Sequence, residues 1–172
     1  MHRKPLLDLL ERYIPTKEEI SNKANIIAFV KDNKNCFERS SKTGHITASA
    51  WLLNKTGDKA LLTHHKKLDA WVQLGGHCDG DPNVLNVAIK EAQEESGIPM
   101  IIAVMDSIFD LDIHFIPPNS KEKGHYHYDL RFLLQAQEND ELTLNDESNE
   151  LRWISKDIKA LPTRERAVIR MF

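Results

Sequence analysis

Three glutamates are spaced so that their carboxylates fall on one side of a helix. Glu91, Glu94 and Glu95 are related as i, i+3 and i+4, which at about 100° per residue places them on a single stripe. Such carboxylates repel one another unless a cation lies between them, and rigidly held oxygen ligands suit Mg²⁺ or Mn²⁺. The spacing therefore indicates a divalent-metal site. The alternative is an acidic helix face that only meets solvent.

The glutamates belong to residues 75–98, in which the positions of glycine and proline predict a loop followed by a helix. Gly75 and Gly76 let backbone N–H groups approach bound phosphates closely, and Gly97 is a residue type on which helices end. No Gly or Pro interrupts residues 83–96. The stripe expected to face the core comprises Leu85, Ala88, Ile89 and Ala92, whereas Val84 and Val87 fall nearer the acidic side.

This stretch resembles the Nudix box, the signature of the Nudix hydrolases. The signature reads Gly, five residues, Glu, seven residues, and then Arg-Glu-U-x-Glu-Glu-x-Gly-U, in which U is a bulky apolar residue. Its first Gly falls on Gly76 and its closing run falls on residues 90–98. Three positions depart from it: Pro82 replaces the first Glu, Lys90 replaces the Arg, and the small Ala92 replaces a bulky apolar residue.

The resemblance implies a fold and an activity. The fold is of the α/β class, a Nudix-type α/β/α sandwich with a mixed sheet. Residues 1–172 form a single domain, in which residues 1–35 add an N-terminal helical extension. The activity is hydrolysis of the pyrophosphate bond in a nucleoside diphosphate linked to another group, with Mg²⁺ or Mn²⁺ as cofactor.

The resemblance also assigns roles to individual residues. The metal ligands are Glu91, Glu94 and Glu95. The catalytic set is Glu91, Glu94 and Lys90, and one glutamate of the box, or Glu147 or Glu150 from a later loop, takes the proton of the attacking water. Lys90 keeps the charge of the family's Arg but lacks its planar fork. The family's first Glu mainly organises the loop, so Pro82 need not end catalysis.

A second polar pattern lies in residues 124–137, which alternate as a β-strand does. His125, His127, Asp129 and Arg131 share one face, and tyrosines and apolar residues share the other. The polar face either meets solvent or lines a cleft in which Arg131 and the histidines contact phosphate. The substrate-binding set is therefore Gly75, Gly76, Arg131 and His127. Trp71 or a tyrosine is expected to stack on a base.

The remaining chain predicts two N-terminal helices and further strands. Helices are expected at 4–13 and at 16–31. Strands are expected at 46–53 and 59–65, which pair as a hairpin, and one or two strands are expected within 101–115, interrupted around Asp110. A loop is expected at 117–120, and a polar loop carries Asp140, Asp146, Glu147 and Glu150. Residues 1–35 could form a lid, a contact in a homodimer, or an addition to the core.

Composition restricts the function class. The net charge of −3 argues against nucleic-acid binding, and no apolar run is long enough to span a membrane. Two cysteines are too few for a disulfide framework, and a cytoplasmic location fits these features. His77, Cys78, His125 and His127 can be grouped as a zinc site, but their spacings match no usual zinc pattern, and the sequence does not favour this grouping.

Two alternatives to a hydrolase remain at this stage. One is a non-catalytic Nudix-like domain that senses a nucleotide, suggested by Pro82 and Lys90. The other is isomerisation of isopentenyl diphosphate on the same fold, which requires a cysteine and an acid beside an allylic carbon. Cys78 lies in the glycine loop and is not obviously placed for that chemistry.

Overall fold

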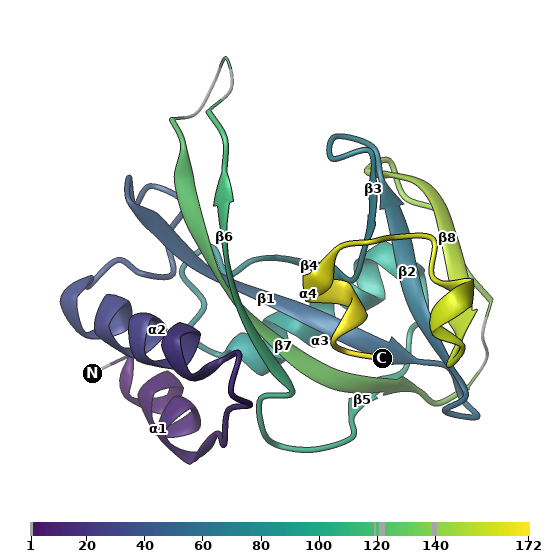
Figure 1. Ribbon diagram of the computed structural model, residues 1–172, viewed down its shortest axis with the longest axis horizontal. Coiled ribbons are helices and arrows are strands. Elements are labelled where there is room, and N and C mark those ends of the chain that lie inside the picture. The colour runs from purple at the N-terminus through teal and green to yellow at the C-terminus, as the bar shows by residue number, and fades with distance from the viewer. Residues whose placement is uncertain (1, 119, 121–122, 139–140) are drawn as a thin grey trace.

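The computed structural model describes residues 2–118, 120, 123–138 and 141–172 (Figure 1). Asn119 of the predicted loop and Asp140 lie outside these ranges. The helices are α1 (Lys4–Arg12), α2 (Ile20–Asp32), α3 (Val84–Ser96) and α4 (Arg166–Ile169), with a 3-10 turn at Ile158–Ala160. The strands are β1 (Gly44–Leu53), β2 (Lys59–His65), β3 (Ala70–Val72), β4 (Leu74–His77), β5 (Ile101–Ala103), β6 (Asp110–Ile116), β7 (His125–Ala136) and β8 (Ser148–Ser155). None of the described helices is long and apolar enough to cross a membrane.

The strands form one mixed sheet around β1. This strand pairs in parallel with β7 and antiparallel with β4, but it meets β2 only at Leu53 and Ala60. The predicted β1–β2 hairpin is therefore short, and β2 pairs mainly with β8 and β3. As a result the sheet divides into two arms, the β6–β7 hairpin and the β2–β3–β8 group (Figure 1). The α/β class and the mixed sheet are as predicted.

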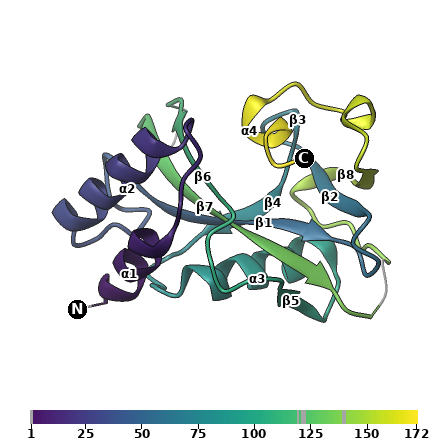
Figure 2. The same ribbon diagram turned by 60° about the horizontal axis from the view of Figure 1, so that its bottom comes forward.

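Alternation along the strands gives the sheet two different faces. One face carries Ile46, Ala48, Leu130 and Phe132, which are fully buried in the larger core with residues of α1, α2 and α3. The other face carries a smaller core at one end, where the C-terminal segment covers it (Figure 2). The buried residues of this smaller core are Trp51, Ala60, Leu62, Ile154, Val168 and Met171.

The N-terminal helices are part of the larger core. Leu6 and Leu10 of α1 and Ile26 of α2 are at most 1% exposed, and the Phe29 ring stacks on Tyr128 with centroids 3.9 Å apart. The Glu19 carboxylate accepts the Leu111 N–H at 2.9 Å, which ties α2 to β6. Glu19 also accepts bonds from Thr16, as a capping box predicts, although α2 begins only at Ile20.

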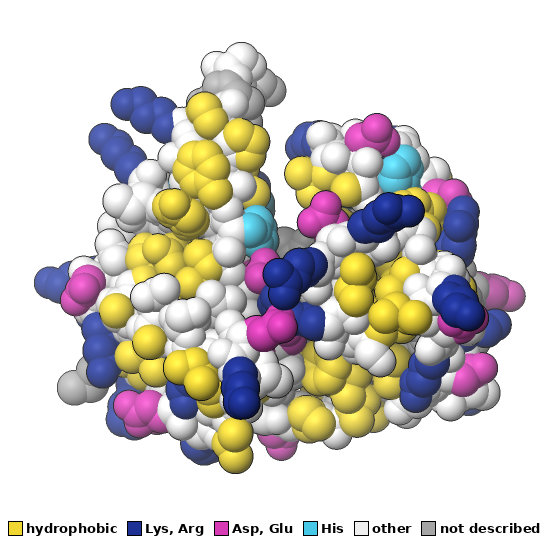
Figure 3. Space-filling view, viewed as in Figure 1, with side chains coloured by type: hydrophobic (Ala, Val, Ile, Leu, Met, Phe, Trp, Pro, Cys, Tyr) yellow, Lys and Arg dark blue, Asp and Glu magenta, His cyan; other side chains and the backbone are white. Residues whose placement is uncertain are grey.

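Beyond the smaller core, the second face of the sheet is polar and highly ordered. Its side chains form three rows across β6, β7 and β1, set by the strand register. The rows are Asp110–Arg131–Ser49, Asp112–Asp129–Thr47 and His114–His127–His45. Figure 3 shows the molecule hollowed between the two arms, with histidine, acidic and basic side chains along the hollow.

Arg131 is enclosed within these rows. It is 2% exposed, and its Nε donates to Asp129 at 2.8 Å while Nη1 donates to Asp110 at 2.9 Å. Nη1 also donates to the Ala167 carbonyl oxygen at 2.8 Å, and Nη2 lies 3.3 Å from Asp112. Every guanidinium nitrogen is therefore occupied by an internal acceptor. The sequence-based assignment of Arg131 to phosphate binding does not fit this position, because each guanidinium nitrogen already donates to an acceptor inside the protein.

We predict that Arg131→Met lowers the free energy of unfolding by about 3–5 kcal/mol, because it leaves Asp129 buried without its cation and removes one of the two arginines that pair with Asp110. Denaturant unfolding monitored by circular dichroism measures the change. The control is Arg166→Met, since Arg166 lies 3.6 Å from Glu18 in a largely exposed pair and should cost less than about 1 kcal/mol. A stable Arg131→Met protein with only weakened substrate binding would return Arg131 to the substrate site.

Candidate active site

Helix α3 carries the three glutamates and has the predicted ends. The Asn83 side chain accepts the Asn86 N–H at its start, and Gly97 ends it in the left-handed conformation with φ 76°. Its buried face differs from the predicted one, because Val84, Val87 and Glu95 are buried whereas Leu85 and Ile89 are only partly so. The helix is therefore rotated so that one edge of the acidic stripe enters the core.

This rotation gives the three carboxylates different environments. Glu95 is 9% exposed, and burial, followed by repulsion from Glu91, raises its pKa to about 8. Burial and then Glu94 also raise the pKa of Glu91. Glu94 is exposed, and its Oε1 lies 3.5 Å from Lys90 Nζ. Closely spaced carboxyls with raised pKa values are the environment that a cation would stabilise.

The paired glycines of β4 allow the helix to approach the sheet. Gly75 has φ +154°, and a Cβ there would lie 2.7 Å from Ser49 Cα. A Cβ at Gly76 would collide with the Glu91 carboxylate. The Gly75 N–H bonds to the Glu95 carboxylate. Both predicted glycines therefore contact the glutamate site directly, through the backbone.

The loop between β4 and α3 is held by an ion pair that the sequence did not reveal. Arg39 donates from Nε and Nη2 to the two carboxylate oxygens of Asp79, at 2.5 and 2.7 Å. Asp81 accepts the Asn83 N–H at 2.8 Å. These contacts fix the loop around Pro82 without the glutamate that the family pattern places there. No spacing signal links Arg39 to Asp79, because they are 40 residues apart.

The later loop offers one acidic group near the glutamates. Glu147 is exposed, and its charge contributes to the raised pKa of Glu95. Glu150 instead bonds to Arg152, whose Nη2 lies 2.6 Å from Glu150 Oε1. Of the two candidates from the sequence, Glu147 is thus the one beside the site. The donor set around α3 consists of carboxylate oxygens, which fits a hard cation such as Mg²⁺ or Mn²⁺.

His127 lies on the polar face, in a cluster of histidines rather than beside the α3 glutamates. Its ring centroid is 4.7 Å from that of His45 and 5.0 Å from that of His77. Burial lowers the pKa of His45 to about 4 and also lowers that of His127, so both rings are neutral at pH 7. The sequence singled out His127 and His77 but missed His45, which joins them through the β1–β7 register.

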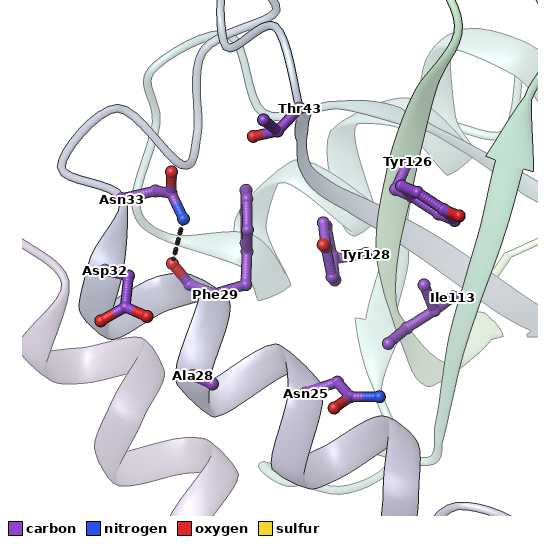
Figure 4. Close-up of a pocket in the computed structure, with 9 residues that line it drawn as sticks. All are labelled: Asn25, Ala28, Phe29, Asp32, Asn33, Thr43, Ile113, Tyr126 and Tyr128. Carbon is purple, nitrogen blue, oxygen red and sulfur yellow. Dashed lines mark hydrogen bonds between the residues drawn. The ribbon is translucent and has the colours of Figure 1, made fainter.

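The aromatic candidates for base stacking are partly occupied. Trp71 lies under the Arg152 guanidinium, 4.6 Å from the ring centroid, and stacks with His64. One face of Tyr128 is covered by Phe29. The rings of Phe29 and Tyr128 line a groove of about 570 Å³ between α2 and the β6–β7 hairpin (Figure 4). Tyr126, which is 46% exposed, is the more open ring of this groove.

Comparison with known proteins decides the family. The family model described as NUDIX domain matches residues 43–170, most of the chain. The chain belongs to the Nudix family. This confirms the resemblance inferred from residues 76–98 and makes the chain an enzyme of the Nudix pyrophosphohydrolase type. No curated protein matches the chain.

Several solved structures share the fold. An Ap4A hydrolase from C. elegans in a binary complex aligns with TM-score 0.53 at 21% identity, over 74% of this chain and 93% of that one. The E. coli dihydroneopterin triphosphate pyrophosphohydrolase aligns with TM-score 0.55 at 12% identity, over 73% and 90%. A UDP-X diphosphatase aligns with TM-score 0.51 at 15% identity, over 96% and 83%. The alignment with the UDP-X diphosphatase therefore includes most of residues 1–35 of this Nudix chain.

We predict that Glu95→Gln makes the metal-free protein more stable than wild type above pH 8. The pKa of Glu95 is raised in the folded state, so its favourable contribution is complete below the ordinary value of 4.5 and is lost as pH rises to about 8. The loss is about 1.4 kcal/mol for each pKa unit, and glutamine removes it. Thermal unfolding at several pH values with a chelator measures it.

Millimolar Mg²⁺ should raise the melting temperature of wild type and have little effect on the Glu95→Gln variant, because a ligand stabilises only the state that binds it. Glu11→Gln is the matched control, since Glu11 is exposed on α1. Equal Mg²⁺ responses in wild type and Glu95→Gln would contradict a metal site at Glu95.

Proposed function

We propose that this Nudix protein is a divalent-metal-dependent hydrolase that cleaves the pyrophosphate bond of a nucleoside diphosphate linked to another group. The observation that supports it most is the placement of α3 against β4. There Glu91 abuts Gly76, and the Glu95 carboxylate bonds to the Gly75 N–H. Glu91, Glu94 and Glu95 would hold Mg²⁺ or Mn²⁺.

The chemistry of the site suits this substrate class. A bound divalent cation would neutralise the dense charge of a diphosphate and activate water for attack on phosphorus. The chain itself supplies backbone N–H groups at the glycines, and a carboxylate would take the proton of the attacking water. The candidates for that proton transfer are the glutamates of α3 and Glu147, whose charge acts on Glu95.

The alternatives from the sequence receive less support. Cys78 is 4% exposed within the larger core, and burial raises the pKa of its thiol, which does not suit the cysteine of an isopentenyl diphosphate isomerase. A nucleotide sensor would not need a catalytic carboxylate set. The named substrates of the similar structures, Ap4A, dihydroneopterin triphosphate and UDP-X, all contain phosphoanhydride bonds, which agrees with hydrolysis of such bonds here.

The test is a screen of nucleoside diphosphate derivatives with Mg²⁺ and Mn²⁺, with products identified by mass. Dinucleoside polyphosphates, nucleotide sugars and nucleoside triphosphates form the substrate set. Reaction in heavy-oxygen water identifies which phosphorus is attacked. Metal-dependent turnover that is lost in Glu94→Gln and Glu95→Gln supports the proposal. Tight nucleotide binding without any turnover would indicate the sensor instead.

We predict that Lys90→Met lowers kcat about two- to tenfold with little change in KM. Lys90 Nζ lies 3.5 Å from Glu94 Oε1 in an exposed pair, which is worth less than about 1.4 kcal/mol. An interaction that orients a catalytic group acts mainly in the transition state. Lys90→Arg, with its bidentate fork, should retain or raise kcat. Wild-type kcat in Lys90→Met would show that Lys90 only reaches into solvent.

A further inference from the structure

A second constellation of ligand-type side chains lies on the polar face of the sheet. His45 of β1, His77 of β4 and His127 of β7 each present a ring nitrogen, and the three nitrogens lie within 4.8 Å of one another. The strand register brings them together, because His45 pairs with His127 and His77 is opposite Thr47, two residues along β1. Segments that are far apart in the sequence thus converge on one point.

His45 is the member whose state requires an explanation. It is 2% exposed, and within the described part of the chain neither Nδ1 nor Nε2 has a hydrogen-bond partner. Leaving a buried polar group unsatisfied costs about 1–3 kcal/mol, and buried polar atoms nearly always have partners. The rings of His77 and His127 are 5.0 and 4.7 Å from it. A ligand bound among the three rings would satisfy His45.

The donor set determines the type of ligand. Neutral imidazole nitrogens suit Zn²⁺, Co²⁺, Ni²⁺ or Cu²⁺, whereas Mg²⁺ and Mn²⁺ prefer oxygen. Tetrahedral coordination with Zn–N bonds of 2.0–2.1 Å places ligand nitrogens about 3.4 Å apart. The rings therefore need to move together by only about 1 Å. His77 and His127 are half-buried, which leaves an approach for the ion from solvent.

We propose that His45, His77 and His127 bind a transition-metal ion of the Zn²⁺ class. The site is separate from the α3 glutamates. Successive residues of a strand point to opposite faces, so His77 projects away from the side on which Gly76 meets Glu91. Three histidines leave a fourth coordination position open, and His125, whose Nε2 lies 3.3 Å from His127 Nε2, stands beside it.

The proposed site differs from the zinc grouping with Cys78 that the sequence does not favour. Cys78 is buried in the larger core with Ile46 and Ala88, so it is not a ligand. His45 takes its place, and its position depends on pairing of β1 with β7 rather than on a local spacing. Sequence patterns of zinc sites rely on ligands close together in the chain, which is why this group matches none of them.

The test is a titration of metal-free protein with Co²⁺, followed by its visible absorption, and with Zn²⁺, followed by calorimetry. We expect one Co²⁺ per chain with the intense bands of a low-coordinate nitrogen site, in the presence of millimolar Mg²⁺. The substitutions His77→Asn and His127→Asn should each weaken Co²⁺ binding more than about a hundredfold, since losing even an outer-shell partner of a metal ligand costs 10–100-fold in affinity. The matched control is His64→Asn, because His64 contacts Trp71 and Asp69 instead.

A double variant, Glu94→Gln with Glu95→Gln, distinguishes the two sites. Retained Co²⁺ binding there supports the histidine site, whether or not the protein hydrolyses nucleotides. The proposal is overturned if wild type binds no Co²⁺, or if binding survives both histidine substitutions, or if only the glutamate variant loses it. The His77 and His127 variants carry the test because His45 is fully buried. Circular dichroism of each variant confirms that it is folded.

Discussion

The parallel pairing of β1 with β7 is the interaction on which the rest of this structure depends. It aligns Ser49 with Arg131, Thr47 with Asp129 and His45 with His127. Asp129 is the central group, because it accepts bonds from Thr47, Ser49 and Arg131 while only 1% exposed. A buried carboxylate is tolerable only when its oxygens are satisfied and its charge is paired. A shift of one residue would turn Ile46 and Ala48 from the larger core to the polar face and break these bonds.

The same strands serve two chemistries because their two faces are separate. The apolar face supplies the surface on which α3 packs, and that packing buries Glu95 at the edge of the acidic stripe. Burial makes the carboxyl costly to ionise, and a bound cation would offset that cost. The polar face holds its charges in fixed rows. Packing in the core therefore makes ionisation of Glu95 unfavourable. The side chains of the polar face are instead positioned by the strand register.

Local patterns in the sequence predicted local structure well. The C-terminal end of α3 follows from Gly97, and the strand expected at 59–65 is β2. The alternation of β7 correctly separates histidines from tyrosines. What failed depends on distant pairing. Arg131 resembled a phosphate ligand until β6 placed Asp110 opposite it, and nothing local connects His45 with His127, 82 residues later. The predicted core face of α3 is right at Ala88 and Ala92, which are fully buried. It is displaced to one side, because Val84 and Val87 are buried more deeply than Leu85 and Ile89.

The loop around Pro82, which departs from the Nudix pattern, is also held by contacts between residues that are distant in the sequence. Pro82 stands where the family has a glutamate that organises the loop. The loop is still held, since Arg39 pairs with Asp79 and Asp81 accepts the N–H of Asn83, the N-cap residue of α3. Arg39 comes from the segment just before β1, so the loop is anchored to the same strand that orders the polar face. Because the anchor lies outside the loop, the loop can lose its own glutamate while the α3 carboxylates keep their positions against Gly75 and Gly76.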